Sequence, residues 1–202
     1  PVGDTRIVID VLPNRPDLLS HEGLAREIGA ATGKQLHRPL HPPATLTRSG
    51  DSSPQTTVDV TVDDIEGTPR YMTAIVRGVT VSPSPDWLAS RVEAAGARSI
   101  SNIVDVTNYM LHGFGQPMHA FDLRKLEGGK VIVRRATKGE KITTLDGVDR
   151  TLDESMTVIA DANHAQAIAG VIGGKGSEVT DETTDILLEV AAFNPRAVRA
   201  TR

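Results

Sequence analysis

The sequence of 202 residues contains no cysteine, which excludes disulfide bonds and metal sites with thiolate ligands. It also has no apolar run long enough to cross a membrane, and its first residues do not follow the basic-then-apolar pattern of a secretion signal. An excess of positive charge is missing too, because 22 basic residues stand against 26 acidic ones and give a net charge of −4. This balance argues against a dominant phosphate-binding surface, so any contact with RNA should be local or be supplied by a larger assembly.

The pattern of apolar and polar residues divides the chain into two modules and a linker. Residues 1–35 contain a short strand at Arg6–Val11 and a helix that begins at Ser20 and ends at Gly33. Residues 36–56 are rich in proline, serine and threonine without an apolar period, which is typical of a linker. Residues 57–202 form the larger module. We predict an α/β fold of mixed α+β type, with mixed sheets and flanking helices, plus a small N-terminal α+β segment.

In the larger module, the periodicity predicts helices at 84–96 and 102–112 and strands at 57–62, 71–76, 130–135, 141–145, 150–152, 157–160, 165–172 and 185–191. Asp146–Gly147 predicts a hairpin turn. Asn194 begins a further helix, with Pro195 in its first turn, that reaches Arg202 without a stop signal. Because the chain also starts at Pro1 rather than at a methionine, we expect it to be a piece of a longer polypeptide.

The most informative stretch is the helix 102–112 and the turn that follows it. Gly113 and Gly115 end this helix, and Pro117 prevents a new one, so His119 should lie in a tight segment close to Thr107 and Asn108. A helix with so many polar groups at one end usually borders a site. His119 could instead hold its turn by bonding a backbone carbonyl, and Thr107 and Asn108 could brace the helix end.

Glu189 lies within the apolar stretch 186–192, which predicts a strand buried on both faces. A carboxylate there must find hydrogen-bond donors or face a cavity, because an unpaired buried charge is very costly. Two interpretations stay open on the residues alone: an ion pair with an arginine, or a binding site. Similarly, Gly170, Gly173 and Gly174 could line a site or only supply a turn with positive φ.

Two other motifs do not match the phosphate-binding loop or the metal site that they suggest. Gly170–Ser177 resembles a phosphate-binding loop, but Gly176 follows Lys175 where serine or threonine is needed, and the first glycine is misplaced. His112 and His119 lack a third ligand at a compatible spacing, so we predict no metal site.

Four separated motifs resemble, in the same order, the B3/B4 domain family of the β subunits of bacterial-type phenylalanyl-tRNA synthetase. They are Asn14–Asp17 with Gly23–Glu27, Ser101–Asp122, Ala169–Gly174 and Leu187–Glu189. The resemblance covers almost the whole chain except about 36–56. It implies that residues 1–35 are the C-terminal part of a B1-like domain, and that 57–202 are a B3/B4 tRNA-editing domain truncated at its C-terminus.

In that family the domain hydrolyses tyrosine wrongly esterified to tRNA(Phe), by attack of water on the ester. The resemblance implies that Glu189 accepts a hydrogen bond from the tyrosine hydroxyl and that Gly173 and Gly174 bind substrate through their backbone. It implies that His119, Asn108 and Thr107 position the ester and the water.

The resemblance further implies that this chain holds no cofactor and that ATP and Mg are bound by the other subunit. The implied partners are the 3′ end of tRNA(Phe) and the α subunit in an (αβ)2 assembly, in the cytoplasm and without a membrane. Two alternatives are a non-catalytic module that scaffolds the αβ synthetase and docks tRNA, and a free-standing trans-editing deacylase. Because residues after the helix at Asn194 complete the family's pocket, we expect a fragment ending at Arg202 to have little activity.

Overall fold

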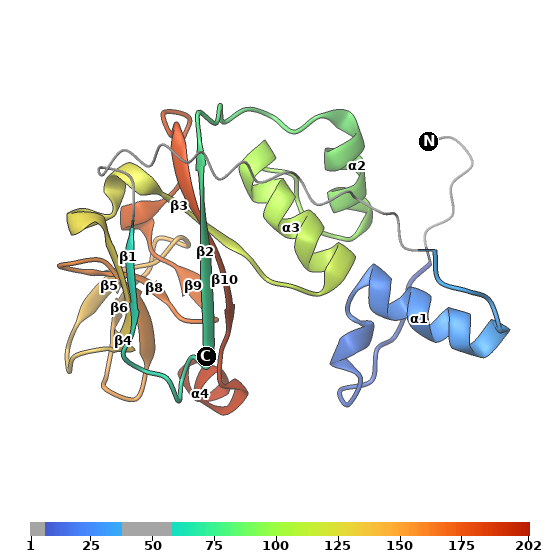
Figure 1. Ribbon diagram of the computed structural model, residues 1–202, viewed down its shortest axis with the longest axis horizontal. Coiled ribbons are helices and arrows are strands. Elements are labelled where there is room, and N and C mark those ends of the chain that lie inside the picture. The colour runs from blue at the N-terminus through green and yellow to red at the C-terminus, as the bar shows by residue number, and fades with distance from the viewer. Residues whose placement is uncertain (1–6, 38–57) are drawn as a thin grey trace. The chain divides into compact units, whose positions relative to one another are not determined.

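A computed structural model describes residues 7–37 and 58–202, which belong to two compact units (Figure 1). The first unit combines the described residues up to 37 with residues 83–117, and the second combines 58–82 with 118–202. Among the described residues, no helix has the length and apolar character needed to span a membrane. The predicted linker falls almost entirely on residues 38–57, outside the described residues.

The first unit is helical. It contains a 3-10 turn and three helices: η1 (Pro16–Leu18), α1 (His21–Thr32), α2 (Asp86–Ala94) and α3 (Asn102–Phe114). Helix α1 begins where predicted, since the Ser20 side chain accepts a hydrogen bond from the Gly23 amide, and it ends at Gly33 with φ of 68°. The strand predicted at Arg6–Val11 is wrong over residues 7–11, which pair with no strand and leave Ile7 and Val8 exposed.

The motif Asn14–Asp17 and the motif Gly23–Glu27 form one local structure. The Arg15 guanidinium binds the carboxylates of Asp17 and Glu27 at 2.9 and 2.8 Å. A Cβ atom at Gly23 would lie 1.7 Å from the Asp17 carbonyl oxygen, so the turn can approach α1 only where the side chain is missing. This explains why the two motifs occur together.

Helix α3 is capped by Ser101, whose hydroxyl accepts from the Val104 amide, and its last residue is Phe114, two residues later than predicted, with Gly115 as the C-cap. Its Asp105 is fully buried and accepts hydrogen bonds from Ser84, Ser99 and the Ile100 amide at 2.6, 2.5 and 3.0 Å. Ser84 therefore braces α3 rather than capping α2, whose first residue follows Pro85.

The second unit consists of a five-stranded sheet, a three-stranded sheet and a hairpin. The large sheet has the order β1 (Asp59–Val62), β4 (Lys130–Arg135), β7 (Thr157–Ala160), β8 (Ala165–Ile168), β9 (Ile172–Gly173). The small sheet has the order β2 (Arg70–Arg77), β10 (Asp185–Ala192), β3 (His119–Asp122). The hairpin joins β5 (Lys141–Thr143) to β6 (Asp149–Thr151), and the remaining elements are η2 (Leu123–Lys125), η3 (Glu127–Gly129), η4 (Lys175–Ser177) and α4 (Pro195–Thr201).

Strand β1 is parallel to β4, whereas the other pairs in both sheets are antiparallel, which confirms the predicted mixed fold. The two sheets share one core, in which Val131, Val133 and Ile159 of the large sheet pack with Phe121 and Leu187 of the small one. Figure 1 shows β2 and β10 side by side in the small sheet.

Two predictions for this unit are wrong. Residues 165–172 do not form one strand. They contain β8 and the start of β9, and a turn at Gly170, with φ of 68°, reverses the chain direction between these two strands. His119 does not lie in a turn, because it is the first residue of β3 and pairs with β10. The pattern of residues 119–122 is too short to predict a strand without knowledge of its partner.

Candidate functional site

Three of the predicted site residues meet inside the second unit. Glu189 in β10 lies directly opposite His119 in β3. The pair Leu187 and Phe121 lies two residues away on each strand. Because side chains alternate along a strand, Glu189 and His119 point to the same side of the sheet as Phe121 and Leu187, toward the core. A Cβ atom at Gly173 of β9 would lie 2.5 Å from the His119 Cε1 atom, so the imidazole packs on this glycine.

Glu189 is 6% exposed, an unusual burial for a carboxyl group. Loss of hydration raises the pKa of Glu189 to about 7, and the nearby Tyr71 hydroxyl counteracts this only in part. Tyr71 lies in β2, on the other side of β10 from His119. The two groups interact, but their contact does not have the geometry of a hydrogen bond, and the Tyr71 hydroxyl has no other partner in the described part of the chain. Within residues 7–37 and 58–202, no arginine forms an ion pair with Glu189.

His119 is held by packing. Its ring meets the Phe121 ring edge to face, with 4.5 Å between the centroids. Burial lowers the pKa of His119 to about 4, so the imidazole is neutral at physiological pH. A neutral imidazole has one donor and one acceptor nitrogen, which suits it to orient water or an ester but makes it a weak base.

The two glycines of the predicted site serve close packing. The Gly174 amide donates to the Gln166 carbonyl at 2.7 Å, and a Cβ atom at 174 would lie 2.6 Å from that oxygen. Of the three glycines considered for a turn, Gly170 alone has positive φ. The space at Gly173 is occupied by the His119 ring, so this glycine shapes the site through His119. Substrate binding by Gly173 and Gly174 stays a prediction.

Thr107 and Asn108 belong to α3 and thus to the first unit. The Thr107 hydroxyl donates to the Val104 carbonyl at 2.7 Å, one turn earlier in the helix. This bond is the bracing role that the sequence left open for Thr107. A catalytic role for Thr107 and Asn108 stays a prediction.

Sequence reasoning missed two buried aspartates that hold the motif around His119. One is Asp105 in α3. Burial alone would raise the pKa of Asp105, but hydrogen bonds from Ser84 and Ser99 lower it below its usual value. Asp122, at the end of β3, is fully buried and accepts from the Thr183 hydroxyl at 2.8 Å. The signal was present in the sequence, because an aspartate inside an apolar run must find donors.

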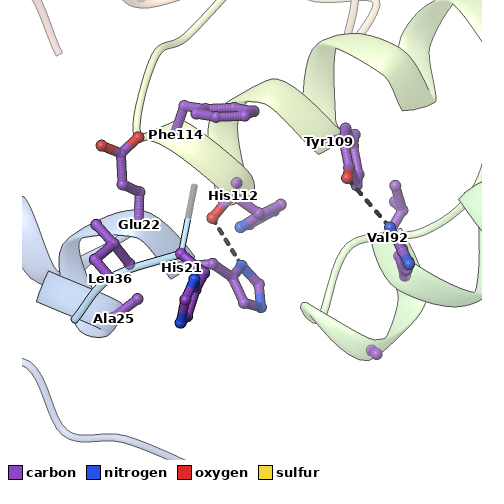
Figure 2. Close-up of a pocket in the computed structure, with 12 residues that line it drawn as sticks. His21, Glu22, Ala25, Leu36, Val92, Tyr109, His112 and Phe114 are labelled. Carbon is purple, nitrogen blue, oxygen red and sulfur yellow. Dashed lines mark hydrogen bonds between the residues drawn. The ribbon is translucent and has the colours of Figure 1, made fainter. Parts of the chain in front are cut away.

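A separate cavity of about 500 Å³ lies in the first unit, among α1, α2 and α3 (Figure 2). His21 donates from Nδ1 to the His112 carbonyl at 2.9 Å, and Arg91 donates to the Tyr109 hydroxyl at 3.2 Å. The cavity wall is mainly apolar, with Ala25, Leu36, Val92 and Phe114 among its residues. In the described ranges no group of three or more histidine, cysteine, aspartate or glutamate side chains could hold a metal ion.

Comparisons with known proteins agree on one family. Residues 67–202 match the model of the B3/4 domain. The chain is 49% identical over 198 residues to the phenylalanine–tRNA ligase beta subunit of Syntrophotalea carbinolica and 49% identical over 202 residues to that of Moorella thermoacetica. Each alignment covers 98% of this chain and 24% of the relative, so the chain spans about a quarter of the length of these curated relatives.

Among solved structures, an N-terminal fragment of the phenylalanyl-tRNA synthetase beta-subunit from Pyrococcus horikoshii aligns with 20% identity and a TM-score of 0.48. That alignment covers 92% of this chain and 55% of the other. The match of the family model over 67–202, which extends from before β2 to the last residue of the chain, decides the assignment. The chain belongs to the B3/4 domain family.

Proposed function

We propose that this chain is part of the β subunit of a phenylalanine–tRNA ligase and that its B3/4 domain hydrolyses tyrosine wrongly esterified to tRNA(Phe). The observation that carries the proposal is the buried carboxyl of Glu189 opposite the neutral imidazole of His119. The relatives with this name support the setting. In this setting the partners are the 3′ end of tRNA(Phe) and an α subunit in an (αβ)2 assembly in the cytoplasm. ATP and Mg act at the other subunit, and this chain needs no cofactor.

The function answers a problem of selectivity. A hydrophobic pocket built for phenylalanine rejects an analogue with one extra hydroxyl by only about 10²-fold. A second site that prefers the hydroxyl can remove the errors. Glu189 can supply that preference, because a hydrogen bond from a phenol to a carboxylate contributes about 1.5–3 kcal/mol.

The raised pKa of Glu189 couples this recognition to pH. With a pKa of about 7, the carboxyl group is protonated in roughly half of the molecules at neutral pH. A hydroxyl that donates to Glu189 binds the charged form better, so binding shifts the carboxyl toward ionisation. Preference for tyrosine should therefore increase as the pH rises through 7 and then level off.

His119 contributes by position. In the reaction, the oxygen of a water molecule attacks the carbonyl carbon of the ester, the bond to the ribose oxygen breaks, and a proton passes from the water to the ribose oxygen. A neutral imidazole held by Phe121 and Gly173 can orient the water or the ester through its two nitrogens. Its low pKa makes it a poor acceptor of the full proton, so its role is to orient the reactants. Because water attacks the ester directly, the reaction includes no covalent step on His119.

The test is deacylation of tyrosyl-tRNA(Phe) by the assembled ligase. Glu189→Ala should slow it by about 10- to 100-fold, which corresponds to the loss of one charge-assisted bond, while phenylalanine charging stays normal. His119→Ala should slow it by about 10- to 10³-fold. Glu154→Ala, which changes an exposed glutamate, is the matched control. If both site variants deacylate at the normal rate but lose affinity for tRNA, the chain is a docking module and the editing proposal is wrong.

A further inference from the structure

Glu189 has a second polar neighbour that the function described above does not use. We propose that Tyr71 is a specificity-determining residue of this site: its hydroxyl donates a hydrogen bond to the hydroxyl oxygen of the bound tyrosine, while that ligand hydroxyl donates to Glu189. The inference rests on the proposed function and adds a residue to it.

The register of the small sheet places the two groups on one face. Tyr71 in β2 lies opposite Ala191 in β10, and Glu189 lies opposite Thr73. Tyr71 and Glu189 are thus diagonal neighbours on adjacent antiparallel strands, a separation that a tyrosine side chain can span. The residues beside them, Thr73 and Ala191, are small. Tyr71 also packs against the core between the two sheets, which fixes its ring.

The hydrogen-bonding capacity of the Tyr71 hydroxyl is unused. The Tyr71 hydroxyl is buried without a hydrogen-bond partner in the described chain. Such groups are rare because they forfeit their bonds to water without replacement. Glu189 lies beside it, is buried, and forms no ion pair with the described residues. These two groups interact from adjacent strands, and they point to a ligand that satisfies both.

A phenolic hydroxyl matches this pair. Tyr71 offers a donor and an ionised Glu189 offers only acceptors, whereas a phenol both accepts and donates. One ligand hydroxyl between them completes the chain of bonds from Tyr71 to ligand to Glu189. Phenylalanine in the same place would offer neither an acceptor to Tyr71 nor a donor to Glu189. Sites built to bond a substrate hydroxyl reject the analogue without it far more strongly than a purely apolar pocket does.

If Tyr71 hinders rather than supports binding of the tyrosine hydroxyl, its substitution should have the opposite effect on the preference for tyrosine. If Tyr71 competed with the ligand by bonding Glu189 directly, its removal would free the carboxyl and strengthen the preference for tyrosine. The sign of the effect of Tyr71→Phe therefore separates a shared contact from a competitor.

The experiment measures kcat/KM for deacylation of tyrosyl-tRNA(Phe) and of phenylalanyl-tRNA(Phe) by the assembled ligase. Tyr71→Phe should lower the value for tyrosyl-tRNA about 3- to 10-fold, the effect of one neutral hydrogen bond, and leave the value for phenylalanyl-tRNA unchanged. The same substitution in a Glu189→Ala background should have a smaller effect, because the two residues share one hydroxyl. Tyr109→Phe changes the only other tyrosine of the chain and should alter neither value.

Three outcomes overturn the inference while the proposed function stands. These are an unchanged value for tyrosyl-tRNA, an increased one, or an equal decrease for both substrates, which would show that Tyr71 only supports packing. In contrast, absence of deacylation by the unaltered ligase, or no effect of Glu189→Ala, overturns the proposed function and the role of Tyr71 with it.

Discussion

Replacing Glu189 by glutamine should change how the stability of the fold depends on pH. Glutamine has nearly the same shape but cannot ionise, so the substitution removes one titration and leaves the packing of β10 in place. Burial raises the pKa of Glu189 from an ordinary 4.5 to about 7 in the folded chain. The difference corresponds to about 3 kcal/mol, at 1.36 kcal/mol for each pH unit.

The sign follows from proton binding. Below pH 4.5 the carboxyl is protonated in the folded and the unfolded chain, and Glu189 adds no pH dependence. Between pH 4.5 and 7 the unfolded chain releases this proton while the folded chain keeps it, so stability falls as the pH rises. Above pH 7 the loss is complete and constant. The free energy of unfolding of Glu189→Gln minus that of the unaltered chain should therefore increase by about 3 kcal/mol between pH 4.5 and 8.

Urea unfolding followed by circular dichroism at a series of pH values measures this difference. His119, whose pKa is lowered to about 4, acts in the opposite direction, because its neutral form stabilises the fold above pH 6.5 and this stabilisation is lost as the pH falls. Both proteins contain His119, so its effect cancels in the difference. A difference that stays constant from pH 4.5 to 8 would refute the reasoning, since Glu189 would then titrate normally in the fold.

Two further predictions concern glycines and share one control. Gly173→Ala should lower the free energy of unfolding by about 1–3 kcal/mol, because the new methyl group overlaps the His119 ring at 2.5 Å, and it should impair tyrosyl-tRNA deacylation. Gly23→Ala should destabilise the first unit by a similar amount, since its methyl group would meet the Asp17 carbonyl at 1.7 Å, and a loss of helical circular dichroism at lower temperature would show it. Gly113→Ala, inside α3 with no atom within 4 Å, should be neutral or stabilising by up to about 1 kcal/mol. Equal stability of all three variants would contradict the steric argument.

The sequence predicted correctly those elements whose ends are set by capping residues or whose length is set by an apolar pattern. Ser20 and Gly33 delimit α1, Asn194 begins α4, and the continuous apolar stretch within 185–191 identifies β10 within one residue. These features depend on caps and periodicity, which act over a few residues. The B3/4 family was also accessible from the sequence, because its motifs retain their order.

Long-range pairing was not accessible. Strand β3 is only four residues long and owes its existence to β10, and the break between β8 and β9 depends on the reversal at Gly170. Tyr71 was overlooked because nothing in its own neighbourhood marks it as polar chemistry. The role proposed for Tyr71 depends on Glu189, which is more than a hundred positions away in the chain but on the adjacent strand.

The central place of β10 in the small sheet has a consequence for biosynthesis. In the described part of the chain, β2 and β3 each pair with β10 on opposite edges, and β10 is the last of these strands to be made. A ribosome adds about 5–20 residues per second, so β2 waits on the order of ten seconds for its partner. Tyr71 is present from the start of that interval and His119 is added during it, but the two cannot be joined through β10 until β10 is made. The nascent chain therefore carries unpaired strands that invite misassembly or chaperone binding until residues 185–192 emerge.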